Sequence, residues 1–297
     1  MTDLDSPPET PPESTLPPWR IVDLPGRGPL RIRDSGSPPG GGPATPVLFL
    51  LHGWTVSSDL NWCRVYSGLT ERFRVVSWDQ RGHGRHGLRP RKRFRLEDCA
   101  DDAAAVIGQL DVQKAIVVGY SMGGAVAQLL WRRHPHMVSG LVLCATGMRF
   151  RQTIAEYRDF ALIQLASRPA GLFPETAWHL AERVAAARAP AGSLIDADFD
   201  RWASGEVRAG DLAQILGAGV ALGGFDSSPW VGSVTIPTAV LVGVSDPVIP
   251  TARQRQLATA LPQPFIIEFS GGHSAPVTRP EHFTEQLLTG IDTVAGG

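Results

Sequence analysis

The sequence is poor in cysteine, and its three cysteines follow no recognisable pattern. Cys63, Cys99 and Cys144 are far apart and form neither a CxxC pair nor a combined Cys/His motif of the kind that binds zinc. An odd number of scattered cysteines favours reduced thiols, which are typical of the cytosol. Cys144 also lies inside an apolar run, where a thiol usually serves as a small core residue. We therefore expect a cytoplasmic protein with no metal site.

The chain also lacks an excess of charge of either sign. Its 28 basic and 29 acidic residues leave a formal net charge of −1, so no overall field would draw it to nucleic acid or to acidic polymers. We expect no nucleic-acid partner and a small, neutral or apolar ligand instead. One local exception is a basic run made of Arg89, Arg91, Lys92, Arg93 and Arg95. Such a run is usually solvated surface, although an acidic headgroup or a phosphate-bearing thioester could dock there.

Long apolar stretches are missing as well. No segment supplies the roughly 20 uninterrupted apolar residues that a membrane-spanning helix requires. Residues 1–18 are rich in Pro, Ser, Thr and Glu and have neither the basic start nor the apolar stretch of a secretory signal. The sequence therefore predicts a soluble protein that begins with a disordered tail over residues 1–18.

Short β-rich runs that alternate with helix-length segments dominate the rest of the chain. The 43% hydrophobic content is enough for a large core, and continuous apolar runs are typical of strands covered on both faces by helices. This rhythm predicts an α/β protein with a doubly wound, mostly parallel, eight-stranded sheet that opens with a hairpin. The expected strands lie at residues 21–22, 30–32, 47–51, 75–78, 115–118, 141–143, 239–242 and 265–267.

The rhythm breaks once, between residues 148 and 229. No convincing strand occurs there, and the segment is Ala-rich and helical in pattern. It could close one edge of the domain or cover the mouth of an active site, and the two roles are compatible. We therefore predict a core formed by residues 19–147 and 230–297, with a helical cap over residues 148–229 inserted before the last two strands.

The sharpest motif is G-Y-S-M-G at residues 119–123, directly between an expected strand and an expected helix. That context is the one in which G-x-S-x-G forms a nucleophile elbow. A serine on such a tight turn has a strained backbone, so the residues two before and two after it must be small, as Gly119 and Gly123 are. The motif predicts Ser121 as a nucleophile and the Met122 amide, at the start of the helix, as a donor to an oxyanion.

A serine hydroxyl needs a base to accept its proton and an acid to orient that base. Asp246 follows an expected strand and so lies at the edge where parallel sheets gather their sites. His273 follows the last expected strand in a glycine-rich loop. His282 and Asp226 are alternatives by residue type, but His282 lies in an expected helix and Asp226 follows no strand. We predict His273 as the general base and Asp246 as the residue that orients it.

The order Ser, Asp, His, with each residue after its own strand, resembles the α/β-hydrolase superfamily from Trp19 onward. The segment His52-Gly53-Trp54 is similar to the HG-x motif of that family, and this resemblance implies that the Trp54 amide is the second oxyanion donor. Residues 79–86 are similar to the family's D-x-R-G-x-G-x-S loop, which is largely structural. His86 stands where serine is usual, and we assign no catalytic role to it or to His83.

The resemblance implies acyl transfer through an acyl-enzyme, with no metal or organic cofactor. Serine at the elbow disfavours epoxide hydrolases and haloalkane dehalogenases, which carry aspartate there. Proline iminopeptidases carry HGGPG where this chain has H-G-W-T-V at residues 52–56, so peptidase activity is disfavoured.

Four functions remain in order of preference. The first is a carboxylesterase or lipase acting on an ester with an apolar acyl group, as the apolar cap suggests. The second is a C–C bond hydrolase of a ring-cleavage product. A cofactor-free perhydrolase is third, because Thr55 stands where those enzymes often have proline. The last is a slow-turnover receptor that keeps the fold and the triad. The sequence leaves the acyl group, the alcohol and the oligomeric state open.

Overall fold

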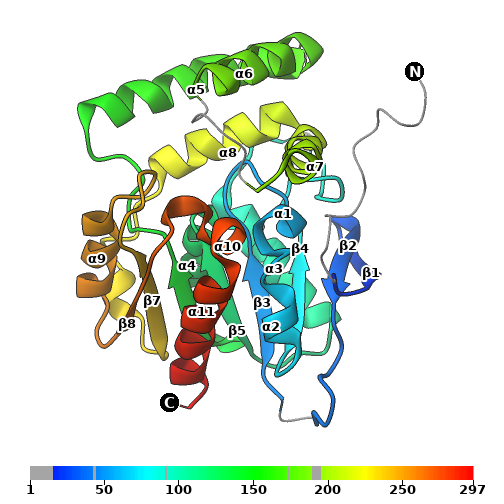
Figure 1. Cartoon of the computed structure of the whole chain (residues 1–297), viewed down its shortest axis with the longest axis vertical. Coiled ribbons are helices and arrows are strands. Elements are labelled where there is room, and N and C mark those ends of the chain that lie inside the picture. The colour runs from blue at the N-terminus through cyan, green and yellow to red at the C-terminus, as the bar shows by residue number, and fades with distance from the viewer. Residues whose placement is uncertain (1–15, 43–44, 91, 173, 189–194, 297) are drawn as a thin grey trace.

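An eight-stranded sheet forms the centre of the protein (Figure 1). The structure is a computed structural model that describes residues 16–42, 45–90, 92–172, 174–188 and 195–296. The tail predicted for residues 1–18 therefore lies outside the described residues, except for its last three. The strands are β1 (Trp19–Leu24), β2 (Gly28–Asp34), β3 (Val47–Leu51), β4 (Arg74–Trp78), β5 (Ala115–Tyr120), β6 (Val138–Cys144), β7 (Thr238–Gly243) and β8 (Phe265–Phe269).

The strand order is β1-β2-β4-β3-β5-β6-β7-β8. Strand β1 pairs antiparallel with β2, and β2 pairs antiparallel with β4. Every pair from β4 to β8 is parallel. The predicted doubly wound, mostly parallel, eight-stranded sheet is confirmed, and so is the opening hairpin. A parallel sheet brings the carboxyl ends of strands that are far apart in the sequence to one edge.

The core consists of two layers on opposite faces of the sheet, because successive side chains of a strand point to opposite sides. On β3, Phe49 and Leu51 belong to one layer, and Leu48 and Leu50 belong to the other. The first face is covered by α3 (Leu96–Gln109), α4 (Met122–Arg133) and α9 (Thr251–Ala260). The second is covered by α1 (Ser58–Trp62), α2 (Tyr66–Thr70), α10 (Ala275–Thr278) and α11 (Pro280–Ala295). Short 3-10 turns lie at Pro135–Met137, Val231–Ser233 and Gly272–Ser274.

Strand β8 differs from the pattern predicted for it. Its apolar run was expected to be covered on both faces, yet Phe265 is 44% exposed and Ile266 is 55% exposed. The reason is topological: β8 is the last strand of the sheet and has only β7 beside it. A continuous apolar run therefore does not by itself distinguish a central strand from an edge strand.

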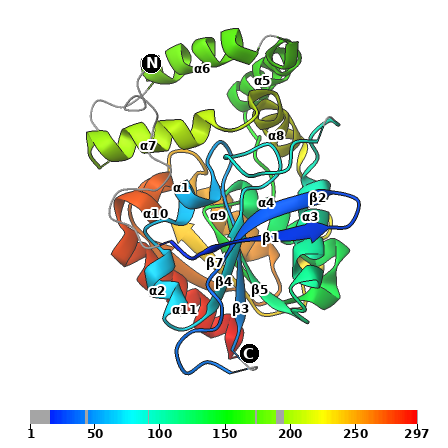
Figure 2. The ribbon, with the colours of Figure 1, turned by 90° about the vertical axis from the view of Figure 1, so that its right-hand side faces the viewer.

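Four helices lie between β6 and β7, in the segment that the sequence marks as a cap. They are α5 (Ile154–Leu172), α6 (Pro174–Arg188), α7 (Ala197–Arg208) and α8 (Leu212–Gly224). Figures 1 and 2 show α5 and α6 as an outer layer, with α7 and α8 beneath them and closer to the sheet. Across the described ranges, none of the helices is both long enough and apolar enough to cross a bilayer.

Candidate active site

Ser121 occupies a sharp turn between β5 and α4. Its φ of 53° and ψ of −114° lie outside the conformations that a side-chain-bearing residue prefers. The turn is possible because its neighbours are glycines. A Cβ added to Gly123 would lie 2.0 Å from the Leu51 carbonyl oxygen, and one added to Gly119 would lie 2.4 Å from the Gly123 carbonyl oxygen. The G-x-S-x-G spacing is therefore a steric requirement of this backbone.

Hydrogen bonds hold the strained turn in place. The Ser121 N–H donates to the Cys144 carbonyl at 2.9 Å. The Ser121 carbonyl accepts from the Gly124 N–H at 2.9 Å and from the Thr146 hydroxyl at 2.8 Å. Since both backbone polar groups of Ser121 are occupied, the turn presents its side chain in a fixed direction.

The structure brings Ser121, His273 and Asp246 together from the loops after β5, β8 and β7. His273 Nε2 lies 3.0 Å from Ser121 Oγ, and His273 Nδ1 lies 2.7 Å from Asp246 Oδ2. An ionised carboxylate can only accept, so the Nδ1 proton points to Asp246 and the Nε2 lone pair faces the serine hydroxyl. This is the arrangement that a general base needs in order to take a proton from serine.

The Asp246 carboxylate is completely buried and fully hydrogen-bonded. Its Oδ1 accepts from the amides of Val248 and Ile249 at 2.8 and 2.9 Å. Its Oδ2 faces His273 and also accepts from Gln254 Nε2 at 3.3 Å. Gln254 is itself held, because its Oε1 accepts from the Gly243 N–H at 2.8 Å. Gln254 belongs to no recognisable motif, so no signal in the sequence points to its role.

Tyr120 supports the histidine loop from the sheet side. Its hydroxyl donates to the His273 carbonyl at 3.0 Å, and the two rings lie 5.4 Å apart. The loop itself bends at Gly271 and Gly272, which have φ values of 116° and 69°. Tyr120 is the variable residue of the G-x-S-x-G motif, so the motif alone does not predict this contact.

The loop after β3 carries the second expected oxyanion donor, the Trp54 amide. The Gln80 N–H donates to His52 Nε2 at 2.8 Å, so this nitrogen has no proton and Nδ1 carries it. His52 Nδ1 therefore donates to the Gly53 carbonyl, 2.7 Å away. The Gly53 carbonyl and the Trp54 N–H belong to one planar trans peptide and point in opposite directions. His52 thus sets the direction of the Trp54 amide.

The His52 imidazole is neutral, because complete burial lowers its pKa to about 3. Asn61 fixes the other side of the loop by accepting the Gly53 N–H on its Oδ1 at 2.9 Å. A Cβ on Gly53 would lie 3.5 Å from Ser121 Cβ, so the loop passes directly beside the serine. Within the part of the chain that the structure describes, neither the Trp54 amide nor the Met122 amide donates a hydrogen bond. Both remain open to an external oxygen.

His282 and Asp226, the alternatives to His273 and Asp246 by residue type, make other contacts. His282 is in α11 and accepts from the Ser270 N–H at 3.3 Å. Asp226 forms a surface ion pair of 2.9 Å with Arg149. His83 is fully buried with its ring 5.4 Å from that of His52, and burial lowers its pKa to about 4.

The buried Asp79 carboxyl group stabilises the loop at residues 79–86. Asp79 accepts from the amides of Ser58 and His86 at 2.8 and 3.1 Å, and burial raises its pKa to about 7. Gly84 adopts a φ of 55° against this carboxyl group, where a Cβ would lie 2.2 Å from Asp79 Oδ2. The ring of His86 lies 5.0 Å from that of Trp19. These contacts are structural, as expected for this loop.

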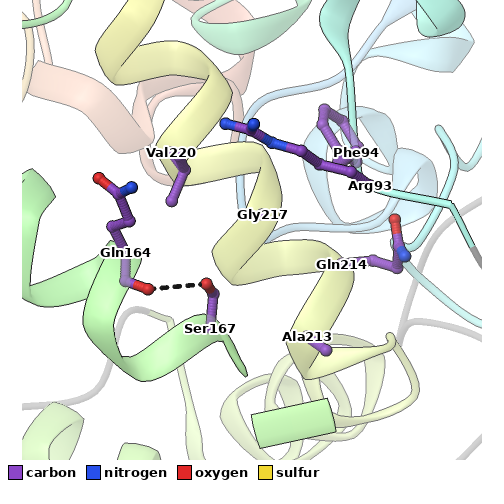
Figure 3. Close-up of a pocket in the computed structure, with 8 residues that line it drawn as sticks. All are labelled: Arg93, Phe94, Gln164, Ser167, Ala213, Gln214, Gly217 and Val220. Carbon is purple, nitrogen blue, oxygen red and sulfur yellow. Dashed lines mark hydrogen bonds between the residues drawn. The ribbon is translucent and has the colours of Figure 1, made fainter. Parts of the chain in front are cut away.

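The basic run is divided between two environments, and Arg91 lies outside the described residues. Arg89 donates to the carbonyls of His83 and Ala209 at 3.2 and 2.9 Å, so it is part of the framework. Arg93 lines a pocket of 330 Å³ between α5, α8 and the segment that precedes α3 (Figure 3). None of the three triad residues lines this pocket. In the described part of the chain, no three His, Cys, Asp or Glu side chains are grouped so that they could hold a metal ion.

The family model for the α/β-hydrolase fold matches residues 46–280. The chain belongs to this family. It is 31% identical over 255 residues to a pimeloyl-[acyl-carrier protein] methyl ester esterase of Chromobacterium violaceum, covering 84% of this chain and 96% of the relative. It is 28% identical over 256 residues to a protein of Serratia proteamaculans named as a candidate carbamate hydrolase, RutD, covering 83% of this chain and 91% of that one.

Solved α/β-hydrolase structures share the fold at lower identity. An esterase from Exiguobacterium antarcticum superposes with a TM-score of 0.73 at 19% identity, covering 92% of this chain and 98% of that one. The likeness to this structure shows the fold alone. The sequence relatives named as an esterase and as a carbamate hydrolase support a hydrolase.

Proposed function

We propose that the protein is a serine esterase that hydrolyses a carboxylic ester through an acyl-enzyme. Ser121 is the nucleophile, His273 is the general base, and Asp246 orients the histidine. The amides of Trp54 and Met122 stabilise the oxyanion. The observation that supports this most directly is the continuous chain of hydrogen bonds from Asp246 through His273 to Ser121, at 2.7 and 3.0 Å.

Acylation begins when Ser121 Oγ attacks the ester carbonyl carbon while its proton passes to His273 Nε2. The carbonyl oxygen becomes an oxyanion facing the two free amides, and the buried Asp246 carboxylate stabilises the imidazolium. The C–O bond to the alcohol then breaks, and the alcohol leaves with the proton from Nε2. The acyl group remains on Ser121.

Deacylation repeats these steps with water. His273 Nε2 takes a proton from water, and the resulting hydroxide attacks the acyl carbonyl at the same oxyanion site. The bond to Ser121 Oγ breaks, and the serine recovers its proton from Nε2. The products are a carboxylic acid and an alcohol, and the enzyme returns to its starting state.

The chemistry of α8 supports a substrate with an apolar acyl group. This helix contacts the oxyanion loop directly, since Trp54 Nε1 donates to the Ile215 carbonyl. Its sequence, LAQILGAGVALGG, contains one polar side chain, Gln214. That side chain is engaged in hydrogen bonds to the carbonyls of Pro90 and Lys92. The helix therefore offers no charge to a substrate and favours a neutral, apolar one.

The proposal is tested with Ser121→Ala and a series of p-nitrophenyl esters graded by acyl length. Removing the nucleophile of such a triad lowers kcat by about 10⁶-fold, so the variant should show no turnover and no labelling by a fluorophosphonate. Ser233→Ala, at an exposed serine, is the matched control and should behave as the wild type. Near-wild-type hydrolysis by Ser121→Ala would refute the assignment.

Two further measurements separate the proposal from its rivals. A matched carbamate belongs in the substrate series because of the RutD-like relatives. Faster turnover of the carbamate than of every ester would overturn the ester assignment while keeping the triad. A single burst of product without steady turnover would instead favour a receptor built on the same fold.

A further inference from the structure

Trp54 is part of the oxyanion loop, and its side chain also forms a hydrogen bond to the cap. Its indole Nε1–H donates to the Ile215 carbonyl of α8 at 2.7 Å, across 161 residues of sequence. We propose that this hydrogen bond is a latch through which the position of cap helix α8 sets the alignment of the oxyanion-donating Trp54 amide. The proposal rests on the proposed function, because it assigns a positioning role to the Trp54 side chain within that same site.

The fit of the indole against α8 depends on a glycine. Ile215 lies in the helix interior, so its carbonyl also faces the amide of Gly219 one turn later. A carbonyl oxygen has a second lone pair that can accept from outside the helix. The indole reaches it because Gly219 has no side chain: a Cβ there would lie 2.6 Å from Trp54 Cζ2. The helix surface is therefore shaped to receive this ring.

The oxyanion loop needs restraints on both sides of the Trp54 amide. On the N-terminal side, His52 and Asn61 hold both polar groups of Gly53 from within the core. On the C-terminal side, Thr55 has a φ of 70°, which is unfavourable for a β-branched residue. A backbone that is strained in this way persists only when its surroundings hold it. The indole hydrogen bond is a restraint that comes from the cap.

Helix α8 has attachments of its own and does not simply follow Trp54. The Asp211 N–H, at its N-terminus, donates to the Gly82 carbonyl at 2.8 Å. Gln214 Nε2 donates to the carbonyls of Pro90 and Lys92 at 3.0 and 3.2 Å, and Figure 3 shows this side chain beside the segment that carries Phe94. The loops after β3 and β4 are thus both connected to α8. An acyl group large enough to displace α8 would therefore also disturb the oxyanion donor.

The first test is Trp54→Phe, which keeps an aromatic ring but removes the indole N–H. Losing one oxyanion donor costs about 10²- to 10³-fold in rate, so a donor that is only partly misaligned should cost about 10-fold in kcat. The KM for a short ester should change by less than about twofold, because the oxyanion exists only in the transition state. Binding of a trifluoromethyl ketone, which forms a tetrahedral oxyanion on Ser121, should weaken by about 10-fold for the same reason.

A second variant tests the latch from the side of the cap. Gly219→Ala places a methyl group against the indole ring, whereas Gly224→Ala makes the same change in the same helix where nothing lies within 4 Å. Gly219→Ala should lower kcat about as much as Trp54→Phe, and Gly224→Ala should leave it unchanged. The double variant Trp54→Phe/Gly219→Ala should be no slower than the slower single variant, since both changes break one contact.

The outcomes distinguish this proposal from the proposed function. If Trp54→Phe and Gly219→Ala both keep the wild-type kcat and the wild-type affinity for the ketone, the latch is refuted while the esterase assignment stands. A parallel loss of kcat in Gly224→Ala would also refute it, because the effect would then be general to α8. A wild-type chain that reacts with neither ester nor fluorophosphonate would overturn both.

Discussion

The inner and outer helices between β6 and β7 are built differently. In the inner helix α7, Phe199 is 3% exposed and Trp202 is not exposed at all, and both pack in a cluster with Leu60 of α1. In the outer helix α5, large apolar side chains face solvent, with Ile154 91% exposed and Leu165 75% exposed. The inner helices are thus part of the core that supports the site, and α5 presents an apolar surface outward.

Two ion pairs of α7 also differ in how far they are buried. The ion pair between Arg85 and Glu206 joins α7 to the loop after β4 at 2.7 Å, and the Glu206 side chain is only 5% exposed. The pair between Arg208 and Glu175, which joins α7 to α6, spans 3.3 Å between side chains that are 42% and 79% exposed. Exposed pairs contribute little to stability because water and salt screen them. The difference teaches that α7 is anchored where it meets the loop after β4 and is held more loosely where it faces α6.

The largest expected effect separates two truncations of apolar side chains. Trp202→Ala should lower the free energy of unfolding by about 3–5 kcal/mol, because it empties a fully buried site. Leu165→Ala should change it by less than about 0.5 kcal/mol, since its side chain already faces solvent. Urea unfolding of both variants measures the comparison. Equal losses would mean that the outer surface of α5 is covered in solution.

A smaller effect separates two acidic residues of α7. Glu206→Ala should cost about 2–3 kcal/mol, because it leaves the Arg85 guanidinium half-buried without its carboxylate. Asp198→Ala breaks a pair with Arg201 whose side chains are 72% and 63% exposed, so it should cost less than about 0.5 kcal/mol. The same urea measurement applies. A cost for Glu206→Ala no larger than that for Asp198→Ala would show that burial of this pair does not anchor α7.

The sequence predicted those features that a local pattern encodes. The alternation of apolar runs predicted the eight strands. The tight turn at Ser121 needs small neighbours, and the sequence shows them as Gly119 and Gly123. The exposure of β8 was missed, because an apolar run does not reveal how many neighbouring strands it has.

The supporting contacts of the candidate site have no such local pattern. Asn61, Gln254 and the indole of Trp54 each bond to a backbone group that the fold brings within reach. Each partner is a backbone group far from its side chain's own motif, and only the tertiary structure brings the two together. The proposed triad residues stand out in the sequence because each follows a strand, whereas the residues that contact them follow no such pattern.

The smallest effect concerns two fully buried imidazoles, that of His52 in the loop after β3 and that of His83 beside it. Burial lowers the pKa of His52 to about 3 and that of His83 to about 4, whereas an imidazole in the unfolded chain titrates near 6.5. Between about pH 4 and 6.5 the unfolded chain therefore binds more protons at these sites than the folded protein. Their contribution to stability is fully present above about pH 6.5 and is lost as the pH falls through this window. Asp79, whose pKa is raised to about 7, contributes a slope of opposite sign.

His83→Gln isolates one of these contributions, because Asp79 and His52 remain in both proteins and their slopes cancel in the difference. Glutamine can still donate to the Arg81 carbonyl, which lies 3.0 Å from His83 Nδ1. The stability advantage of the wild type over the variant should shrink by about 1 kcal/mol for each pH unit between about pH 6 and 4.5. Urea unfolding across that range measures it. A constant difference would mean that the His83 site admits water and that the region beside the loop after β3 is less tightly closed than its buried contacts indicate.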